Sequence, residues 1–259
     1  MDRRKFVAAS LVTSAAALVQ NAKAQASPGR LREFYQLRRY TLQTGPQVAM
    51  TEKYISEALI PAMAKRGGPV GAFRLDIGPE TPSFYVLIPV HDPAMAGTLE
   101  FELAQDADYV KTAEPFWSAS AASPAFLRMD SSLLVAFEGW PRITPPAKGK
   151  RIFQLRTYES PSYRDHILKV QMFHSGEFEI FKAAGFQPVF FGDTLIGQRM
   201  PSLTYMLGFA DSADLDAKWN VFRNDPAWKK LSADPRFAFE AIVSNITNLV
   251  LSPLAASQI

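Results

Sequence analysis

The feature that most constrains how this 259-residue chain can fold is an internal duplication. Residues 35–40, Tyr-Gln-Leu-Arg-Arg-Tyr, recur 118 residues later as Phe-Gln-Leu-Arg-Thr-Tyr at 153–158. Pro115-Phe116-Trp117 likewise matches Pro226-Ala227-Trp228. Matching segments in one order, with offsets that change only where a loop can shorten, indicate two copies of one folding unit.

Each copy is predicted to contain the same elements. Period-two alternation and punctuating Gly and Pro predict strands at 34–41, 70–77, 83–90 and 131–137 in the first copy. Helical spacing predicts a helix over 46–66, and residues 93–121 are expected to be helical in parts, interrupted at Pro115. The order β-α-β-β-α-β is ferredoxin-like. The predicted fold class is therefore α+β, with two tandem modules packed sheet to sheet.

The two modules are assigned to residues 33–138 and 151–252. Between them, residues 139–150 are rich in Pro, Gly and Lys, which is typical of a linker.

The N-terminus has the pattern of an export signal. Arg3 and Arg4 precede an uncharged run rich in Ala, Val and Leu, and two small-x-small cleavage sites end at Ala24 and Ala26. The arginine pair with Phe6 resembles a twin-arginine signal, although Asp2 departs from the usual pattern. An ordinary secretory signal is the alternative. Either assignment makes residues 1–26 a signal peptide and the mature protein periplasmic or secreted.

Removing the signal changes the charge of the protein. Four of the 28 basic residues and one of the 25 acidic residues lie in residues 1–24, so the remainder carries 24 of each. A chain with no net charge gives no reason to expect a nucleic-acid or anionic-membrane partner. The chain also lacks cysteine, which excludes disulfides and thiolate chemistry.

A repeated set of polar side chains is the candidate binding surface. Alternate residues of a strand share a face, and a Gln-Arg-Tyr face recurs while the opposite face differs between the copies. Guanidinium and phenol groups suit an anionic or carbonyl-bearing ligand. The alternative is that these arginines only tie strand to helix. The candidate residues are Gln36, Arg38, Tyr40, Gln154, Arg156 and Tyr158.

The aromatic-Gln-Leu-Arg-x-Tyr strand, the long helix and the late Asp-Pro-x-Trp element resemble the NIPSNAP family. The resemblance covers nearly all of the mature sequence and implies a dimeric α+β barrel formed within one chain. The family usually has Glu where this chain has Gln36 and Gln154, and Glu114 stands in place of the late Asp in the first copy. If that Glu has a catalytic role in the family, both copies of this chain lack the catalytic carboxylate.

His174 is the candidate catalytic residue. It is expected on an apolar helix stripe with Ile167, Val170, Phe178 and Phe181, where an imidazole could serve as a base, a proton relay or an axial haem ligand. A hydrogen-bonded core or boundary histidine is the alternative. His166 is expected to be exposed, and the histidines are too scattered to predict a metal site.

Trp117 and Trp228, at equal places in the two copies, are expected to be core anchors. Three functions stay open. The preferred one is binding of a small molecule in a cleft between sheet and helices, with or without cofactor-independent catalysis. The others are a haem protein and a non-catalytic interaction module. Homo-oligomerisation is also open.

Overall fold

The computed structural model describes residues 32–43 and 45–259. The predicted signal peptide, residues 1–26, lies outside the described residues. The first module contains these elements in order: β1 (Phe34–Thr41), α2 (Pro46–Lys53), η1 (Tyr54–Leu59), α3 (Ile60–Ala64), β2 (Gly71–Ile77), β3 (Ser83–Val90), α4 (Pro93–Leu103), α5 (Ala107–Trp117) and β4 (Arg128–Ala136).

The second module repeats this order with extra turns of helix before its last strand. Its elements are β5 (Ile152–Glu159), α6 (Tyr163–Met172), η2 (Phe173–Glu177), α7 (Phe178–Ala183), β6 (Gln187–Ile196), β7 (Ser202–Phe209), α8 (Ser212–Asn224), α9 (Pro226–Ser232), η3 (Pro235–Phe237), α10 (Phe239–Ile242) and β8 (Asn245–Pro253). The predicted α+β class and ferredoxin-like order are confirmed.

The strands of the described residues close into one barrel in the order β1-β3-β2-β8-β5-β7-β6-β4. Within each module the central pair comes from the first and third strands, and all neighbours are antiparallel. Two seams join the modules: β2 pairs with β8, and β4 pairs with β6. Because both seams form inside one chain, no sheet edge is left unpaired in the barrel.

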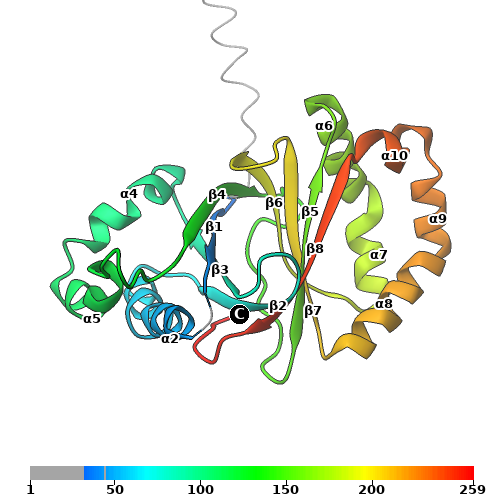
Figure 1. Ribbon diagram of the computed structural model, residues 1–259. Helices are drawn as coiled ribbons and strands as arrows, with labels where there is room; N and C mark the ends of the chain where they lie inside the picture. The colour runs from blue at the N-terminus through cyan, green and yellow to red at the C-terminus, as the bar shows by residue number, and fades with distance from the viewer. Residues whose placement is uncertain (1–31, 44) are drawn as a thin grey trace, which may run out of the picture.

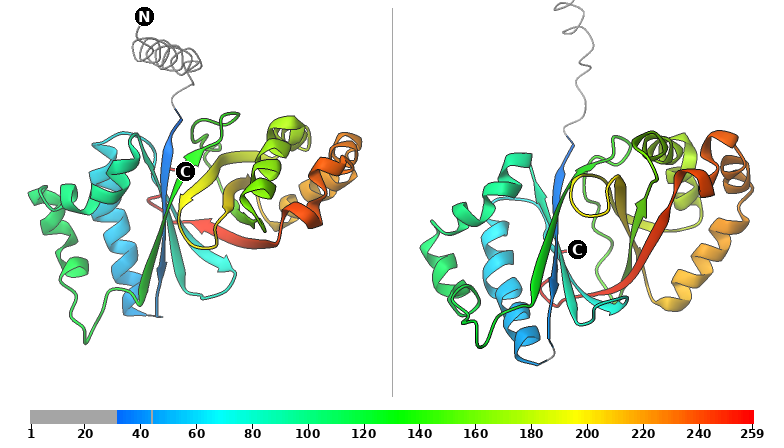
Figure 2. Two further views of the ribbon diagram at one scale, coloured as in Figure 1. Left: turned by 90° about the horizontal axis from the view of Figure 1, so that it is seen from above. Right: turned by 45° about the horizontal axis from the view of Figure 1, so that its top comes forward.

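The helices lie outside the barrel on two opposite sides. Figure 1 shows α2, α4 and α5 beside the strands of the first module and α6 to α10 beside those of the second. Figure 2 shows the same two helical layers with the strands between them. Each sheet therefore has an inner face that meets the other sheet and an outer face covered by its own helices.

The inner faces meet in an apolar core. Tyr35 packs edge-to-face on Phe190 at 5.3 Å, and Phe73 packs on Phe153 at 5.0 Å, each pair joining the two modules. Since strand residues alternate between faces, the Gln-Arg-Tyr face of β1 and of β5 points outward, toward the helices. The candidate residues thus lie between sheet and helices rather than inside the barrel.

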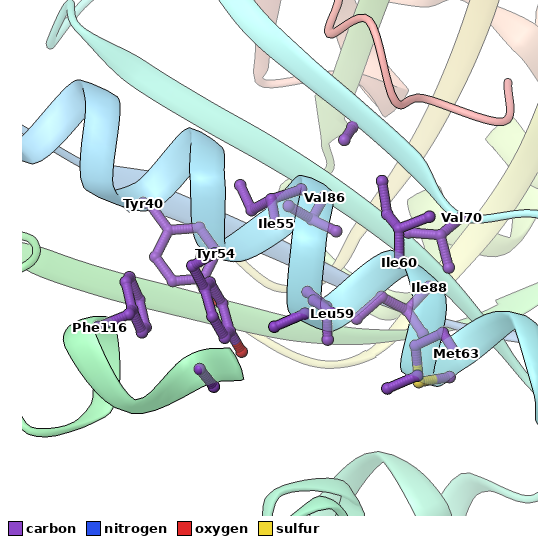
Figure 3. Close-up of a cluster of buried hydrophobic side chains, with 14 of the residues drawn as sticks. Tyr40, Tyr54, Ile55, Leu59, Ile60, Met63, Val70, Val86, Ile88 and Phe116 are labelled. Carbon is purple, nitrogen blue, oxygen red and sulfur yellow. The ribbon is translucent and has the colours of Figure 1, made fainter. Parts of the chain in front are cut away.

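The space between sheet and helices is filled by aromatic side chains in the first module. Tyr54 of η1 stacks on Phe116 of α5 with ring centroids 3.8 Å apart, and Tyr40 packs edge-to-face on Phe116. Figure 3 shows these three rings together, next to Ile55 and Leu59. Tyr54 and Tyr109 also share a hydrogen bond of 2.8 Å. This side of the barrel is a closed hydrophobic core.

Two details of the predicted elements are wrong. The expected interruption at Pro115 is absent, because Pro115 lies in the last turn of α5. The chain instead breaks at residues 104–106, where the Asp106 side chain accepts from the backbone N–H groups of Asp108 and Tyr109 and starts a new helix. The last strand of the module begins at Arg128 rather than at Ser131.

Candidate functional site

In the first module the side chains of the Gln-Arg-Tyr face make hydrogen bonds and an ion pair within the protein. Arg38 is 1% exposed. Its Nε and one terminal nitrogen donate to Gln36 Oε1 at 3.0 and 2.8 Å, and its other terminal nitrogen pairs with Glu100 of α4 at 2.6 Å. Gln36 in turn donates to the backbone oxygen of Ala96, also on α4. Arg38 therefore ties β1 to α4, as the structural alternative predicts.

In the second module the equivalent arginine meets an aromatic ring instead of a carboxylate. Asp92 caps α4 and Asp211 caps α8, and eight residues beyond these caps lie Glu100 and Trp219 respectively. The guanidinium carbon of Arg156 lies 4.5 Å from the Trp219 ring centroid. With Trp219 at the position that matches Glu100, Arg156 lacks the anionic partner that Arg38 has.

The Trp219 ring is held in place by two side chains of β5, Gln154 and Arg156. Its indole nitrogen donates to Gln154 Oε1 at 2.7 Å. Arg156 donates from one terminal nitrogen to the Tyr158 hydroxyl at 2.9 Å, and Tyr158 shares a 2.9 Å hydrogen bond with Tyr205. The three candidate residues of β5 are therefore brought together, with Trp219 and Tyr205 as partners.

The guanidinium of Arg156 keeps unused hydrogen-bonding capacity. Its Nε is buried and has no partner, and no acidic side chain in the described part of the chain forms an ion pair with it. Burial acts to lower the pKa of Arg156, but the Tyr205 and Tyr158 hydroxyls act in the opposite direction and leave it above the usual value. Arg156 is a cation without an anion beside it.

Arg156 opens onto a cavity of about 400 Å³ on the outer side of the second sheet. Aromatic rings supply most of the apolar lining: Trp219, Phe222, Trp228 and Phe239. Glu177 also lines it, while Asp216 and Arg223 are exposed. Trp228 is thus part of a cavity wall rather than only a core anchor, and its counterpart Trp117 is 38% exposed.

A larger cavity of about 590 Å³ lies nearby, between η2, α7 and α9. Its charged side chains either face solvent or are already paired. Glu179 is 78% exposed, and Arg236 pairs with Asp234 at 2.7 Å. Size alone therefore does not select the site, and the smaller cavity, which is lined by an arginine without an acidic partner in the described ranges, is the better candidate.

His174 does not lie in either the cleft or a buried stripe. It is exposed, its Nδ1 donates to the Val170 backbone oxygen at 2.9 Å, and its Nε2 accepts from the Gly139 backbone N–H at 3.1 Å. Both ring nitrogens are occupied by backbone groups. His174 therefore does not fit the role of an axial haem ligand, and it fits that of a boundary histidine.

The predicted apolar stripe of this helix is wrong, and its phase is the reason. Ile167 is 54% exposed, whereas Lys169 and Glu177 are buried. The helix widens into a π-helical segment, η2, and kinks at Gly176, whose φ of 139° lies outside the helical range. The wider turn changes the phase along the helix, so the constant spacing that fits Phe178 and Phe181 beyond the turn puts Ile167, ahead of it, on the wrong face.

The sequence does not by itself assign three residues to the site: Trp219 and Glu177, which line the cleft, and Lys169, which is buried behind its wall. The missed signal for Trp219 was the helix cap, since aligning Asp92 with Asp211 reveals the Glu-to-Trp exchange. His166, expected to be exposed, is instead buried, with Nε2 2.7 Å from Asp193 of β6. The side chain turns inward because Asp193 offers it a partner.

A family model described as NIPSNAP matches residues 153–258. Residues 153–258 therefore form a NIPSNAP domain. The match includes Arg156, Trp219 and Glu177, so the whole candidate site lies in the NIPSNAP domain. No curated protein sequence matches this chain.

Two solved structures that cover most of this chain share its fold. A protein from Lactobacillus acidophilus named "putative monooxygenase" is 12% identical, with a TM-score of 0.59 over 88% of this chain and 97% of that one. A "putative monooxygenase" from Fusobacterium nucleatum is 10% identical, with a TM-score of 0.53 over 86% and 93%. A NIPSNAP-like domain protein from Burkholderia xenovorans is 16% identical, with a TM-score of 0.37 over 42% and 89%. At this identity the first two establish the fold alone.

The helices of both modules are short. None in residues 32–43 and 45–259 is long and apolar enough to cross a membrane. Over the same ranges, no three His, Asp or Glu side chains gather closely enough to hold a metal ion.

Proposed function

We propose that this chain binds a small molecule in the cleft of its NIPSNAP domain, and that the ligand carries an anionic or carbonyl oxygen on a planar apolar body. One observation carries the proposal. Arg156 is a largely buried cation that lines the cavity without an ion-pair partner among the described residues, at the position where the first module neutralises its arginine with Glu100.

The shape and lining of the cleft support this ligand class. A volume of about 400 Å³ lies within the usual range of small-molecule sites, roughly 300–1,000 Å³. Guanidinium presents a planar fork of donors that matches a carboxylate or carbonyl oxygen. Trp219 and Trp228 offer flat apolar surfaces beside it. An aromatic carboxylate or aromatic keto acid would satisfy both features.

We extend the proposal to catalysis that uses the chain's own side chains. The cleft contains ionised groups suited to such chemistry, Arg156 and Glu177. The names of the two barrel proteins described above, both called monooxygenases, are consistent with an enzyme of small organic substrates. Homo-oligomerisation stays a prediction, because both seams of the barrel already close within one chain.

Calorimetric titration with phenylpyruvate tests the binding proposal. Replacing Arg156 by methionine should weaken binding by about 10- to 100-fold, because a hydrogen bond to a charged group contributes roughly 1.5–3 kcal/mol. Arg164→Met is the matched control, since Arg164 is an exposed arginine of the same module outside the cleft. The proposal fails if wild-type protein binds neither phenylpyruvate nor phenylacetate, or if Arg156→Met binds them as tightly as wild type does.

We also propose that residues 1–26 direct export, on the strength of the Arg3-Arg4 pair and the small-x-small sites. Mass spectrometry of protein from the periplasm of an expressing bacterium should give a mature chain that begins after Ala24 or Ala26. Arg3→Lys with Arg4→Lys should hold the precursor in the cytoplasm. Full-length protein that starts at Met1 in every fraction would contradict this assignment.

A further inference from the structure

Two oppositely charged side chains are buried together, Glu177 in the wall of the cleft and Lys169 behind it. Lys169 of α6 is 0% exposed and Glu177 of η2 is 3% exposed, and the Lys169 Nζ donates to Glu177 Oε2 at 2.8 Å. The ammonium also lies 4.5 Å from the Phe173 ring centroid. Removing two charges from water is unfavourable, and apolar residues of similar size often serve stability as well or better.

The first module folds without this pair. Tyr54 and Phe173 begin the two π-helical segments, and at the same spacing the counterparts of Lys169 and Glu177 are Met50 and Ala58. Ala58 is 3% exposed and Met50 is partly buried. The fold therefore needs only apolar residues at these two positions. We infer that the ion pair serves a function that is specific to the second module.

Glu177 has one carboxylate oxygen left for a ligand. Lys169 occupies Oε2, and no hydrogen-bond donor of residues 32–43 or 45–259 reaches Oε1. Glu177 lines the same cavity as Arg156. The kink at Gly176 immediately precedes Glu177 and has a φ of 139° that a side-chain-bearing residue rarely adopts. The chain therefore has an unusual backbone conformation directly before Glu177, the residue whose carboxylate lines the cleft.

Resting on the proposed function, we propose that Glu177 is the proton acceptor of the cleft and that Lys169 is a positioning residue that keeps it ionised. The substrate class is an aromatic carbonyl compound with an acidic C–H bond next to the carbonyl group. Arg156 binds the carbonyl or carboxylate oxygen, and the aromatic walls bind the ring.

The step needs no further reactant. Glu177 removes the proton from the carbon beside the carbonyl, the C–H bond breaks, and its electron pair forms a carbon–carbon double bond. The carbonyl oxygen becomes an enolate oxygen, and the guanidinium of Arg156 stabilises its negative charge. Glu177 then returns the proton to the carbon or to the oxygen. In D₂O the returned particle is a deuteron, so the reaction is visible as isotope exchange.

Exchange at C3 of phenylpyruvate in D₂O, followed by proton NMR, tests the assignment. Wild-type protein should exchange this position at least about 100-fold faster than Glu177→Gln, which is the low end of general-base catalysis. Glu179→Gln is the matched control, since Glu179 is 78% exposed and lies two residues away. Equal rates for wild type and Glu177→Gln, or a wild-type rate equal to that of buffer, would overturn the proposal.

Binding measured on the same samples separates the two proposals. If phenylpyruvate binds through Arg156 but does not exchange, the proton-transfer role is wrong and the binding function stands. If the protein binds neither phenylpyruvate nor phenylacetate, both are wrong.

A second variant tests the role of Lys169. Lys169→Arg retains a cation and should retain exchange, whereas Lys169→Met should shift the pH profile of exchange to higher pH, because a buried carboxylate without a cation favours its protonated form. A purely structural role would lower the rate by the same factor at every pH.

Discussion

Replacing Lys169 by methionine should destabilise the second module more than any other single change in the cleft. The substitution leaves Glu177, 3% exposed, without the ammonium 2.8 Å away. Breaking a buried ion pair from one side typically lowers the free energy of unfolding by about 3–5 kcal/mol. Arg156 shares the cavity and offsets part of the loss, so the lower end is expected, a fall in Tm of roughly 6–12 °C for a chain of this size.

Removing both charges should reverse this effect. In Lys169→Met with Glu177→Leu the buried positions become apolar, as they are at Met50 and Ala58 in the first module. Replacing a buried pair by packed apolar side chains is neutral or stabilising by about 1–4 kcal/mol. The double variant should therefore be as stable as wild type or more stable, yet inactive in isotope exchange. Stability without activity is the signature of a pair retained for function.

Guanidinium unfolding followed by circular dichroism and by tryptophan fluorescence measures these free energies. The exposed pair Lys182–Glu179, 75% and 78% exposed, supplies the control, because Lys182→Met should change the free energy of unfolding by less than about 1 kcal/mol. The reasoning is refuted if the free energy of unfolding of Lys169→Met lies within about 1 kcal/mol of that of wild type. It is also refuted if the double variant is less stable than Lys169→Met.

Two further outcomes follow from the asymmetry of the modules and from a buried phenol. Trp219→Glu should pair with Arg156 as Glu100 does with Arg38 and weaken phenylpyruvate binding at least about 10-fold; unchanged affinity by calorimetry would show that Arg156 is not the anchor. Burial raises the pKa of Tyr109 from 10.0 to about 12, so unfolded protein releases this proton first and stability falls as pH rises from 10 toward 12. Tyr109→Phe should lessen that alkaline fall in Tm, and an identical fall in the variant would contradict this cause.

Most of the barrel could be predicted because its signals are local and occur twice. The strand at 34–41 matches β1 at both ends, since alternation, aromatic content and a following Gly-Pro all agree there. The break between α4 and α5 was placed at Pro115 because proline is the usual helix breaker. The cap at Asp106 decides it instead, and a capping side chain is a weaker signal in a sequence than a proline.

The candidate site was half predictable, for a related reason. Arg156 was found because the Gln-Arg-Tyr face is repeated, and repetition marks what the two modules share. Trp219, Lys169 and Glu177 are what they do not share, so the same comparison conceals them. Lys169 also lies before the π-helical segment and Glu177 at its end, so a spacing of 3.6 residues no longer predicts which side chains face the same way.

The divergence of the two modules has a physical logic. The barrel needs both modules, since each seam takes one strand from each, β2 with β8 and β4 with β6. A cleft with buried charge destabilises the module that holds it, and the aromatic cores of both modules, such as Tyr54 on Phe116 and Phe181 on Phe222, supply stability to the same barrel. With Arg38 neutralised by Glu100 in one module, the other is free to leave Arg156 without an anion. Under the proposed function, a duplicated barrel therefore lets one half neutralise its arginine while the other half keeps Arg156 for a ligand.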